Sequence, residues 1–316
     1  MKKNIKHFIL LSTIAVGALH AANRFITATA EMKNIITSGK GQFFDWKNGS
    51  IFYTKRGTGS PILLIHDLDP ISSGYEWHNL AKKLEKDHTV YKLDLLGCGR
   101  SDKPYLTYTN YLFVQLITDF IQNVIGEKAD IVVSHRSLSF AVLAHNNNKN
   151  IINKIIAINP PELESFEIVN DKYATIRKVM LELPIIGTFI YHVSINTKKI
   201  TKTFQQEYFD KPQHVSTKYI DAYYEAAHKK NSGGKYLKAS IESHYTDNGI
   251  KHAIKKLDIP LYIIQSNYGT DFVKKIDNYC YFNDNIEAAY VSNAKLLPQL
   301  EIPDKTCELI RMFLNK

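Results

Sequence analysis

The stretch DIVVSHRSLSF, residues 130–140, joins an apolar run to a turn of small and polar residues and then to a helical pattern. Such a strand–turn–helix can project a side chain from the carboxyl end of a strand, where a nucleophile is useful. Ser137 is the candidate nucleophile of this turn. A serine hydroxyl attacks well only when a base removes its proton, so Ser137 predicts acyl transfer or ester hydrolysis only with a histidine in reach.

Two histidines lie where a base could act. His135 adjoins the turn, and His66 follows another apolar run, PILLI. The last histidine of the chain is His252, which precedes the run IPLYII, so no histidine follows the last predicted strand. A substitute base for Ser137 would therefore be His135 or His66.

Alternating strand and helix patterns surround this turn. Asn48 and Gly49 separate two alternating runs and predict a hairpin with a tight turn. Later apolar runs alternate with helical patterns and predict strands, namely PILLIHD, HTVYKLDLLG, ADIVVS, IINKIIAIN, IPLYIIQS and NIEAAYVS. We predict the α/β class, with a mostly parallel, doubly wound sheet whose strand ends carry the polar residues.

Strand signals fade between residues 161 and 250, where helical segments rich in tyrosine, lysine and isoleucine take over. We predict that residues 161–250 form an inserted helical cap and that residues 41–160 and 251–316 form one core. Residues 27–40 are predicted to be a connector.

Residues 1–26 resemble a signal sequence or signal anchor. Lys2, Lys3 and Lys6 precede FILLSTIAVGALHAA, and the residues around Ala21 form a poor cleavage site. We predict an uncleaved anchor in the cell membrane with the main domain outside the cytoplasm. A cleaved peptide, which would make the protein secreted, and an amphipathic helix of a cytosolic protein are the alternatives.

The charge distribution and the cysteine content limit which partners and cofactors the chain is expected to bind. The formal net charge is +9, but the lysines are scattered and interleaved with acidic residues, which argues against nucleic-acid binding. Cys98, Cys280 and Cys307 are too widely spaced for a zinc site or a redox dithiol. We therefore predict no cofactor and no metal.

Several motifs together resemble the α/β-hydrolase superfamily, in its capped, epoxide-hydrolase-like and dehalogenase-like branch. They cover residues 42–314: the hairpin, LLIHDLDP, LDLLGCGRSDKP, the turn at Ser137, IPLYII and LLPQLEIP. The most specific is LDLLGCGRSDKP, in which Asp94 and Arg100 are expected to pin a loop. The resemblance implies a G-x-S-x-G nucleophile elbow, here without its glycines, centred on Ser137 or, one residue earlier, on Arg136.

The resemblance also implies the other catalytic positions. Leu296 stands where the triad histidine belongs, and Asp271 fits the acid. The backbone amides of Leu68 and Leu138 would form the oxyanion hole, although Asp67 places a carboxylate where negative charge would develop. A carboxylate nucleophile is not available in either register.

Two functions remain open. The first is a protein with an incomplete triad and weak or no serine-hydrolase activity, which binds a small apolar ligand or an envelope partner. The second is a hydrolase of a small apolar ester that uses Ser137 with a nonstandard base. Aromatic residues of the cap would line the apolar pocket in either case, in particular Tyr191, Tyr219, Tyr223, Tyr224 and Tyr236.

Overall fold

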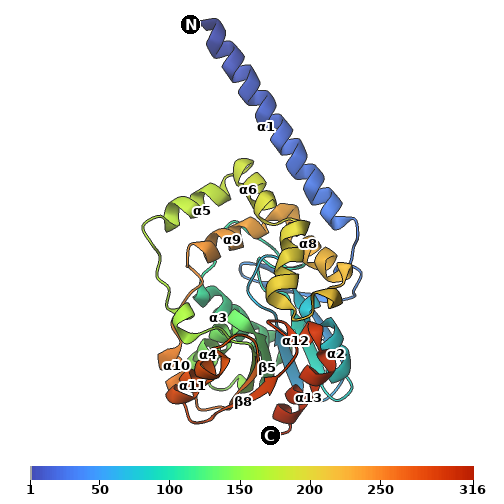
Figure 1. Cartoon of the computed structure of the whole chain (residues 1–316), viewed down its shortest axis with the longest axis vertical. Helices are drawn as coiled ribbons and strands as arrows, with labels where there is room; N and C mark the ends of the chain where they lie inside the picture. Colours follow the sequence, from blue (N-terminus) through green and yellow to red (C-terminus); the bar gives the residue numbers. More distant parts are fainter. Residues whose placement is uncertain (1) are drawn as a thin grey trace.

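Eight strands form one sheet in the order β1-β2-β4-β3-β5-β6-β7-β8 in a computed structural model, which describes residues 2–316 (Figure 1). The strands are Gln42–Trp46 (β1), Gly49–Arg56 (β2), Pro61–Ile65 (β3), Thr89–Leu93 (β4), Ala129–Ser134 (β5), Ile152–Ile158 (β6), Leu261–Ser266 (β7) and Ile286–Val291 (β8). β2 runs antiparallel to β1 and β4, and the other neighbouring pairs are parallel. The predicted mostly parallel sheet with an N-terminal hairpin is confirmed.

The turn of the hairpin lies one residue earlier than its Asn-Gly pair suggests. Trp46 pairs with Gly49 across the hairpin, so the two turn residues are Lys47 and Asn48. Gly49 opens β2 with a φ of 140°, a conformation that residues with a side chain rarely adopt.

Both faces of the sheet are covered by helices. Alternate residues of β3 enter two different cores: Leu63 and Ile65 pack on one face, and Ile62 and Leu64 on the other. The first face is covered by Asn110–Phe120 (α3), Leu138–Asn147 (α4), Lys251–Lys255 (α10) and Phe272–Phe282 (α11), and the second by His78–Leu84 (α2) and Pro303–Leu314 (α13). Because apolar contacts fill both faces, polar side chains gather at the strand ends.

Between β6 and β7 the chain forms the predicted helical cap. Its helices are Ala174–Glu182 (α5), Ile186–Ser194 (α6), Thr197–Thr203 (α7), Thr217–Ser232 (α8) and Gly234–Glu242 (α9), and they lie beyond one end of the sheet (Figure 1). Tyr191 and Tyr223 are fully buried, and the ring of Tyr223 meets that of Phe204 at 4.8 Å. These two tyrosines therefore fill the cap's own core, together with Leu297 and Leu300 from the segment after β8.

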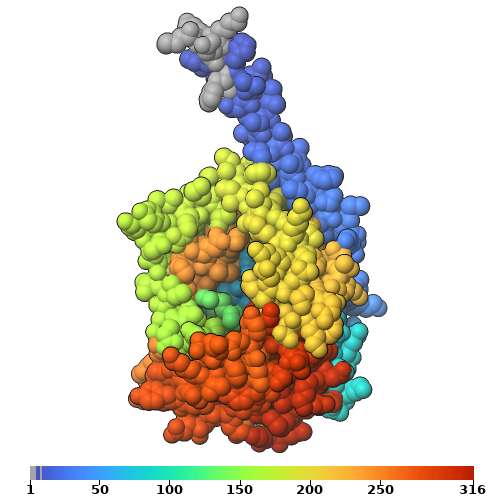
Figure 2. Space-filling model, viewed as in Figure 1, coloured from blue at the N-terminus to red at the C-terminus, as the bar shows by residue number. Residues whose placement is uncertain are grey.

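Helix α1, Lys2–Glu31, projects away from the rest of the molecule (Figures 1 and 2). Its segment Ile5–Glu31 has a mean hydropathy of 1.5 and is long enough to cross a membrane, a test that a signal sequence also passes. The apolar side chains of Ile9, Leu11 and Ile14 are exposed. The helix continues past residue 26, and its C-terminal part packs on α6 and α8.

The connector between α1 and β1 is fixed to the cap by one buried carboxylate. Glu225 of α8 is fully buried and accepts hydrogen bonds from the backbone N–H groups of Ile35 (2.6 Å) and Ile36 (3.1 Å) and from the hydroxyl of Thr37 (2.8 Å). Arg100 donates to the carbonyl oxygen of Gly39 at 2.6 Å and so ties the same segment to the core.

A buried polar network joins three segments at the strand ends. Gln299, after β8, donates to the Glu76 carboxyl (2.7 Å) and to the Ser134 hydroxyl (3.2 Å) at the end of β5. Glu76 belongs to the 3₁₀ turn Gly74–Trp77 before α2 and is fully buried. Burial raises the pKa of Glu76 from 4.5 to about 8, and the nearby Asp67 adds to that rise.

Replacing Glu225 with alanine tests the fixed connector. The backbone N–H of Ile36 would be left buried without an acceptor, so we expect the free energy of unfolding to fall by roughly 2–5 kcal/mol. Urea unfolding of the full-length protein in detergent measures this loss. The control is Asp221→Asn, which breaks a partly exposed ion pair with Lys33 and should cost under about 1 kcal/mol. Equal midpoints for the two variants would refute the role of Glu225.

Replacing Glu76 with glutamine tests its raised pKa. Between pH 4.5 and 8 the folded protein retains a proton that the unfolded chain releases, so stability should fall as the pH rises through this window, by up to about 5 kcal/mol. The glutamine side chain does not titrate, so the free energy of unfolding of Glu76→Gln relative to the wild type should increase from pH 5 to pH 8. Unfolding midpoints at several pH values check this; parallel pH profiles would contradict it.

Candidate active site

The turn after β5 is strained at His135. β5 ends at Ser134, a 3₁₀ turn covers His135–Ser137, and α4 starts at Leu138, as the strand–turn–helix pattern predicts. His135 has a φ of 45°, in the left-handed region that residues with a side chain rarely occupy. In a nucleophile elbow the strained residue of the turn is the one that projects outward. His135, rather than Ser137 or Arg136, therefore lies at the apex of this turn.

Ser137 faces inward at the base of the same turn. Its side chain is fully buried, and its hydroxyl donates to the carbonyl oxygen of His66 at 2.6 Å. Across residues 2–316, no imidazole nitrogen is hydrogen-bonded to this hydroxyl. The role of Ser137 as a nucleophile stays a prediction, and this geometry argues against it because no base is in place to remove its proton.

Both ring nitrogens of His66 are already engaged. Nδ1 lies 2.7 Å from the carbonyl oxygen of Asp67 and must carry the proton, because a carbonyl can only accept. Nε2 accepts the backbone N–H of Leu95 at 3.0 Å. Burial lowers the pKa of His66 and keeps its ring neutral. His66 thus links β3 to the loop after β4, and it does not face Ser137 as a base.

His135 is held by one ring nitrogen. Nδ1 lies 2.8 Å from the carbonyl oxygen of Asn159 at the end of β6, so this nitrogen also carries the proton. Within the described chain Nε2 has no hydrogen-bond partner, and the side chain is half-buried. The apex of the turn therefore presents an oriented imidazole ring.

A carboxylate of the chain itself occupies the position where an oxyanion hole is expected. The backbone N–H groups of Leu68 (2.8 Å) and Arg136 (3.0 Å) both donate to Oδ1 of Asp67. One N–H from the loop after β3 and one from the residue after the elbow apex are the two donors that hydrolases aim at an oxyanion. Leu138, the second donor expected from the sequence, instead donates its N–H to carbonyl oxygens of His135 and Arg136 inside the turn.

The side chain of Arg136 closes this region from the cap side. Its guanidinium forms an ion pair with Asp247, a nearly buried residue in the loop after α9, and Asp247 also binds Nδ1 of His244 at 2.9 Å. The crevice between Leu68, Phe140 and this ion pair is too narrow to hold a water molecule. The ion pair therefore fastens the cap to the turn after β5.

The remaining triad positions bring no imidazole to the turn in the described structure. Leu296 packs against the aromatic core of the cap, and its carbonyl oxygen accepts from the side chain of Asn159 at 3.0 Å. Asp271 is exposed just before α11 and lines a surface depression with Glu162 and Lys275. Asp271 as the catalytic acid stays a prediction, without an imidazole beside it in the described structure.

Asn159 organises the strand ends and was not singled out from the sequence. Its side-chain nitrogen donates to Ser266 (3.0 Å), Lys295 (2.8 Å) and Leu296, and its side-chain oxygen accepts the N–H of Ser266. Its φ is 45°, and its carbonyl oxygen orients His135. The sequence signal is an asparagine between a buried strand and two prolines, a combination typical of a constrained turn.

A second acidic residue lies next to the occupied hole. Asp69 accepts the N–H of Ile71 at 2.9 Å, and burial raises the pKa of Asp69 to about 6, with Asp67 adding to the rise. Two neighbouring carboxyl groups disfavour a developing oxyanion. The described residues contain no group of three or more His, Cys, Asp or Glu side chains arranged to hold a metal ion. The site can accept a proton at His135, but it offers no free pair of donors to a tetrahedral intermediate.

Comparison with known proteins finds the same fold at low identity. No protein-family model matches the chain. A soluble epoxide hydrolase from Corynebacterium sp. is 24% identical over 106 residues, which is 34% of this chain and 36% of that protein. The chain thus matches only about a third of the length of this relative.

Solved structures match over most or all of the chain. A membrane phospholipase A, described as a bacterial virulence factor, superimposes with a TM-score of 0.69 at 16% identity, covering 100% of this chain and 98% of its own. The epoxide hydrolase CorEH gives a TM-score of 0.69 at 16% identity and covers 87% of this chain and 98% of its own. The sheet order, the inserted cap and these matches agree with the motifs in the sequence, and the chain has the fold of the α/β-hydrolase superfamily.

Proposed function

We propose that this chain is a membrane-anchored protein of the α/β-hydrolase fold that acts by binding and has lost serine-type hydrolysis at the strand-end site. The observation that carries the proposal is the double hydrogen bond of Asp67 Oδ1 to the N–H groups of Leu68 and Arg136. These donors are satisfied by a fixed carboxylate, so an oxyanion would have to displace it and would meet its negative charge.

The catalytic positions support the same conclusion. His135 stands at the apex where a nucleophile would project, Ser137 donates inward to a backbone carbonyl, and Leu296 replaces the triad histidine. Each departure removes a different part of the machinery, and triad members act as a unit, so the combined loss is large. The small apolar ligand expected from the sequence stays a prediction, because the crevice beneath the Arg136–Asp247 ion pair is too narrow to hold it.

The membrane location rests on α1. Lys2, Lys3 and Lys6 flank the apolar stretch on its N-terminal side, which favours a cytoplasmic N-terminus and a domain outside the cytoplasm. A protein described as a membrane phospholipase A shares the fold over the full length of this chain, which supports the same location.

A second candidate function follows from His135. Its unpaired Nε2 at the elbow apex could serve as a general base for an attacking water, which would make the protein a slow hydrolase. The occupied oxyanion hole disfavours this function, and the experiment below separates it from the first.

A fluorophosphonate probe and short-chain ester substrates test the proposal on the full-length protein in detergent. We expect no covalent labelling and no ester turnover above background, because Ser137 lacks a base and Asp67 fills the oxyanion hole. Labelling that disappears in Ser137→Ala would overturn the proposal. Turnover that survives in Ser137→Ala but disappears in His135→Ala would establish the second candidate.

A variant that restores the family pattern serves as the positive control. The substitutions Asp67→Gly, His135→Ser and Leu296→His vacate the hole, supply a nucleophile at the apex and return the histidine. We expect this triple variant to be labelled by the probe, whereas Asp67→Gly alone is not. Labelling of Asp67→Gly alone would show that a nucleophile is already present.

The anchor is tested by cell fractionation and intact mass. We expect the protein to stay with membranes after alkaline carbonate extraction and to keep residues 1–26, because the apolar face of α1 is exposed and its cleavage site is poor. Protease added outside the cytoplasmic membrane should digest the main domain. A soluble product that lacks the first residues would instead identify a cleaved signal peptide.

A further inference from the structure

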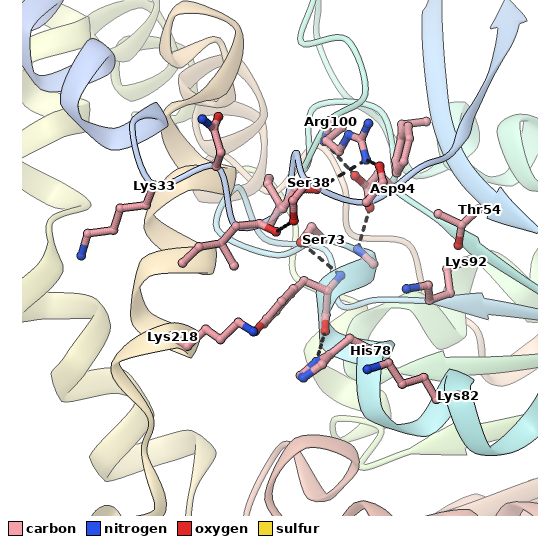
Figure 3. Close-up of a pocket in the computed structure, with 17 residues that line it drawn as sticks. Lys33, Ser38, Thr54, Ser73, His78, Lys82, Lys92, Asp94, Arg100 and Lys218 are labelled. Carbon is pink, nitrogen blue, oxygen red and sulfur yellow. Dashed lines mark hydrogen bonds between the residues drawn. The ribbon is translucent and has the colours of Figure 1, made fainter.

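A cavity of about 580 Å³ lies between the connector and the edge of the sheet, away from the strand-end site (Figure 3). Its walls come from the connector (33–39), β2, the 3₁₀ turn Gly74–Trp77, α2, β4 with the loop that follows it, and the start of α8. The connector wall is fixed by Glu225 and Arg100, as described above. The cavity is therefore built from segments that lie far apart in the sequence, and its connector wall is held in place.

Positive charge dominates its lining. Five lysine or arginine residues line the cavity, and Asp94 is the one carboxylate among the described lining residues. The oxygens of Asp94 are taken by the backbone N–H groups of Gly74 (2.6 Å) and Arg100 (2.7 Å), so this carboxylate pins two loops as its motif predicts. Lys33 is paired with Asp221 at 2.7 Å. The guanidinium of Arg100 binds the connector and stacks on a phenylalanine ring.

The other three positively charged groups of the lining are lysine ammonium groups. Lys82, Lys92 and Lys218 make no side-chain hydrogen bond or ion pair with any described residue, although all three line the cavity. Figure 3 shows Lys82 and Lys92 reaching into it from the core side and Lys218 from the cap side. Burial lowers the pKa of His78 to about 4, and the charges of Lys92, Lys82 and Lys218 contribute to this fall. The three charges therefore lie near the same imidazole.

Two residues of the cavity lining, Thr54 and Tyr75, carry buried hydroxyl groups without partners. Thr54 Oγ1 and Tyr75 Oη are shielded from solvent and make no hydrogen bond within the described chain. Thr54 lies directly across from Lys92 in the β2–β4 ladder, and Tyr75 stacks on His78 with ring centres 4.3 Å apart. Buried hydroxyls are nearly always paired, so these two donors indicate an absent acceptor.

The donor set matches a phosphate. Three ammonium groups and two hydroxyls on opposite walls supply more hydrogen-bond donors than the two oxygens of one carboxylate can accept. A phosphate monoester carries nearly two negative charges and three strong acceptor oxygens. The cavity is much larger than a bare phosphate, and Ile35, Ile36 and Phe52 supply apolar lining for an attached organic group.

We propose that this cavity binds a phosphate-bearing compound, with Lys82, Lys92 and Lys218 neutralising the phosphate and Thr54 and Tyr75 donating to its oxygens. The compound is either a soluble phosphate ester or the headgroup of an anionic lipid, since both present the same group. The proposal is independent of whether the strand-end site is active.

Calorimetric titration of the full-length protein in a neutral detergent tests this proposal with two probes, glycerol 3-phosphate and short-chain phosphatidic acid. We expect saturable binding of at least one. Equal affinity for the two indicates a soluble ester, and clearly tighter binding of phosphatidic acid indicates a lipid. No binding of either at millimolar concentration overturns the proposal.

Substitutions of the lining lysines test whether the phosphate binds in this cavity. Lys92→Gln and Lys218→Gln should each weaken binding by about tenfold or more, as expected for a lost charge-assisted hydrogen bond. Lys218 is exposed on α8, so its replacement leaves the core intact. Lys83→Gln is the matched control, because Lys83 adjoins Lys82 but pairs with Asp304 outside the cavity. Wild-type affinity in Lys218→Gln and Lys92→Gln, or equal weakening in Lys83→Gln, would refute the assignment.

Discussion

The carboxylate of Asp67 holds together the two strand ends on which the rest of the site depends. One of its oxygens accepts an N–H from the loop after β3 and an N–H from the turn after β5, two segments 69 residues apart in sequence. Leaving two such donors buried without an acceptor would cost about 1–3 kcal/mol each. In a hydrolase a transient substrate oxygen meets these donors, whereas here a permanent side chain does. In the function that we propose, the same contact stabilises the turn and removes serine-type hydrolysis from it.

Other polar contacts extend this arrangement from strand to strand. Asn159 links the ends of β6 and β7 to the segment after β8 and orients His135. His66 links β3 to the loop after β4, and Gln299 joins Glu76 to Ser134. These side chains use their hydrogen-bonding capacity within the protein, largely on backbone groups. A site that must bind and release substrate keeps some donors free, and this one keeps few.

Much of the fold could be predicted because it depends on local patterns. β3, β5 and β7 each contain an apolar run and are buried along their whole length, and the loss of such runs after residue 160 predicted the cap. The elbow apex could not be predicted in the same way. The G-x-S-x-G pattern predicted the centre at Ser137, whereas the strain falls on His135, and backbone torsion is not encoded by residue type at such a position. The lysine cavity has no sequence signal, because its walls come from segments spread between residues 33 and 218.

The packing of α1 has a mechanical consequence. Beyond the exposed apolar part, Asn23 donates to the carbonyl oxygen of Ile185, and Thr27 contacts the hydroxyl of Ser232 at 3.0 Å. The helix thus continues into the folded domain as a rigid rod, without a flexible linker. With its other end in a bilayer, such a rod would prevent the domain from swivelling and hold it at one height. Any neighbour in the same membrane would then always meet the same side of the protein.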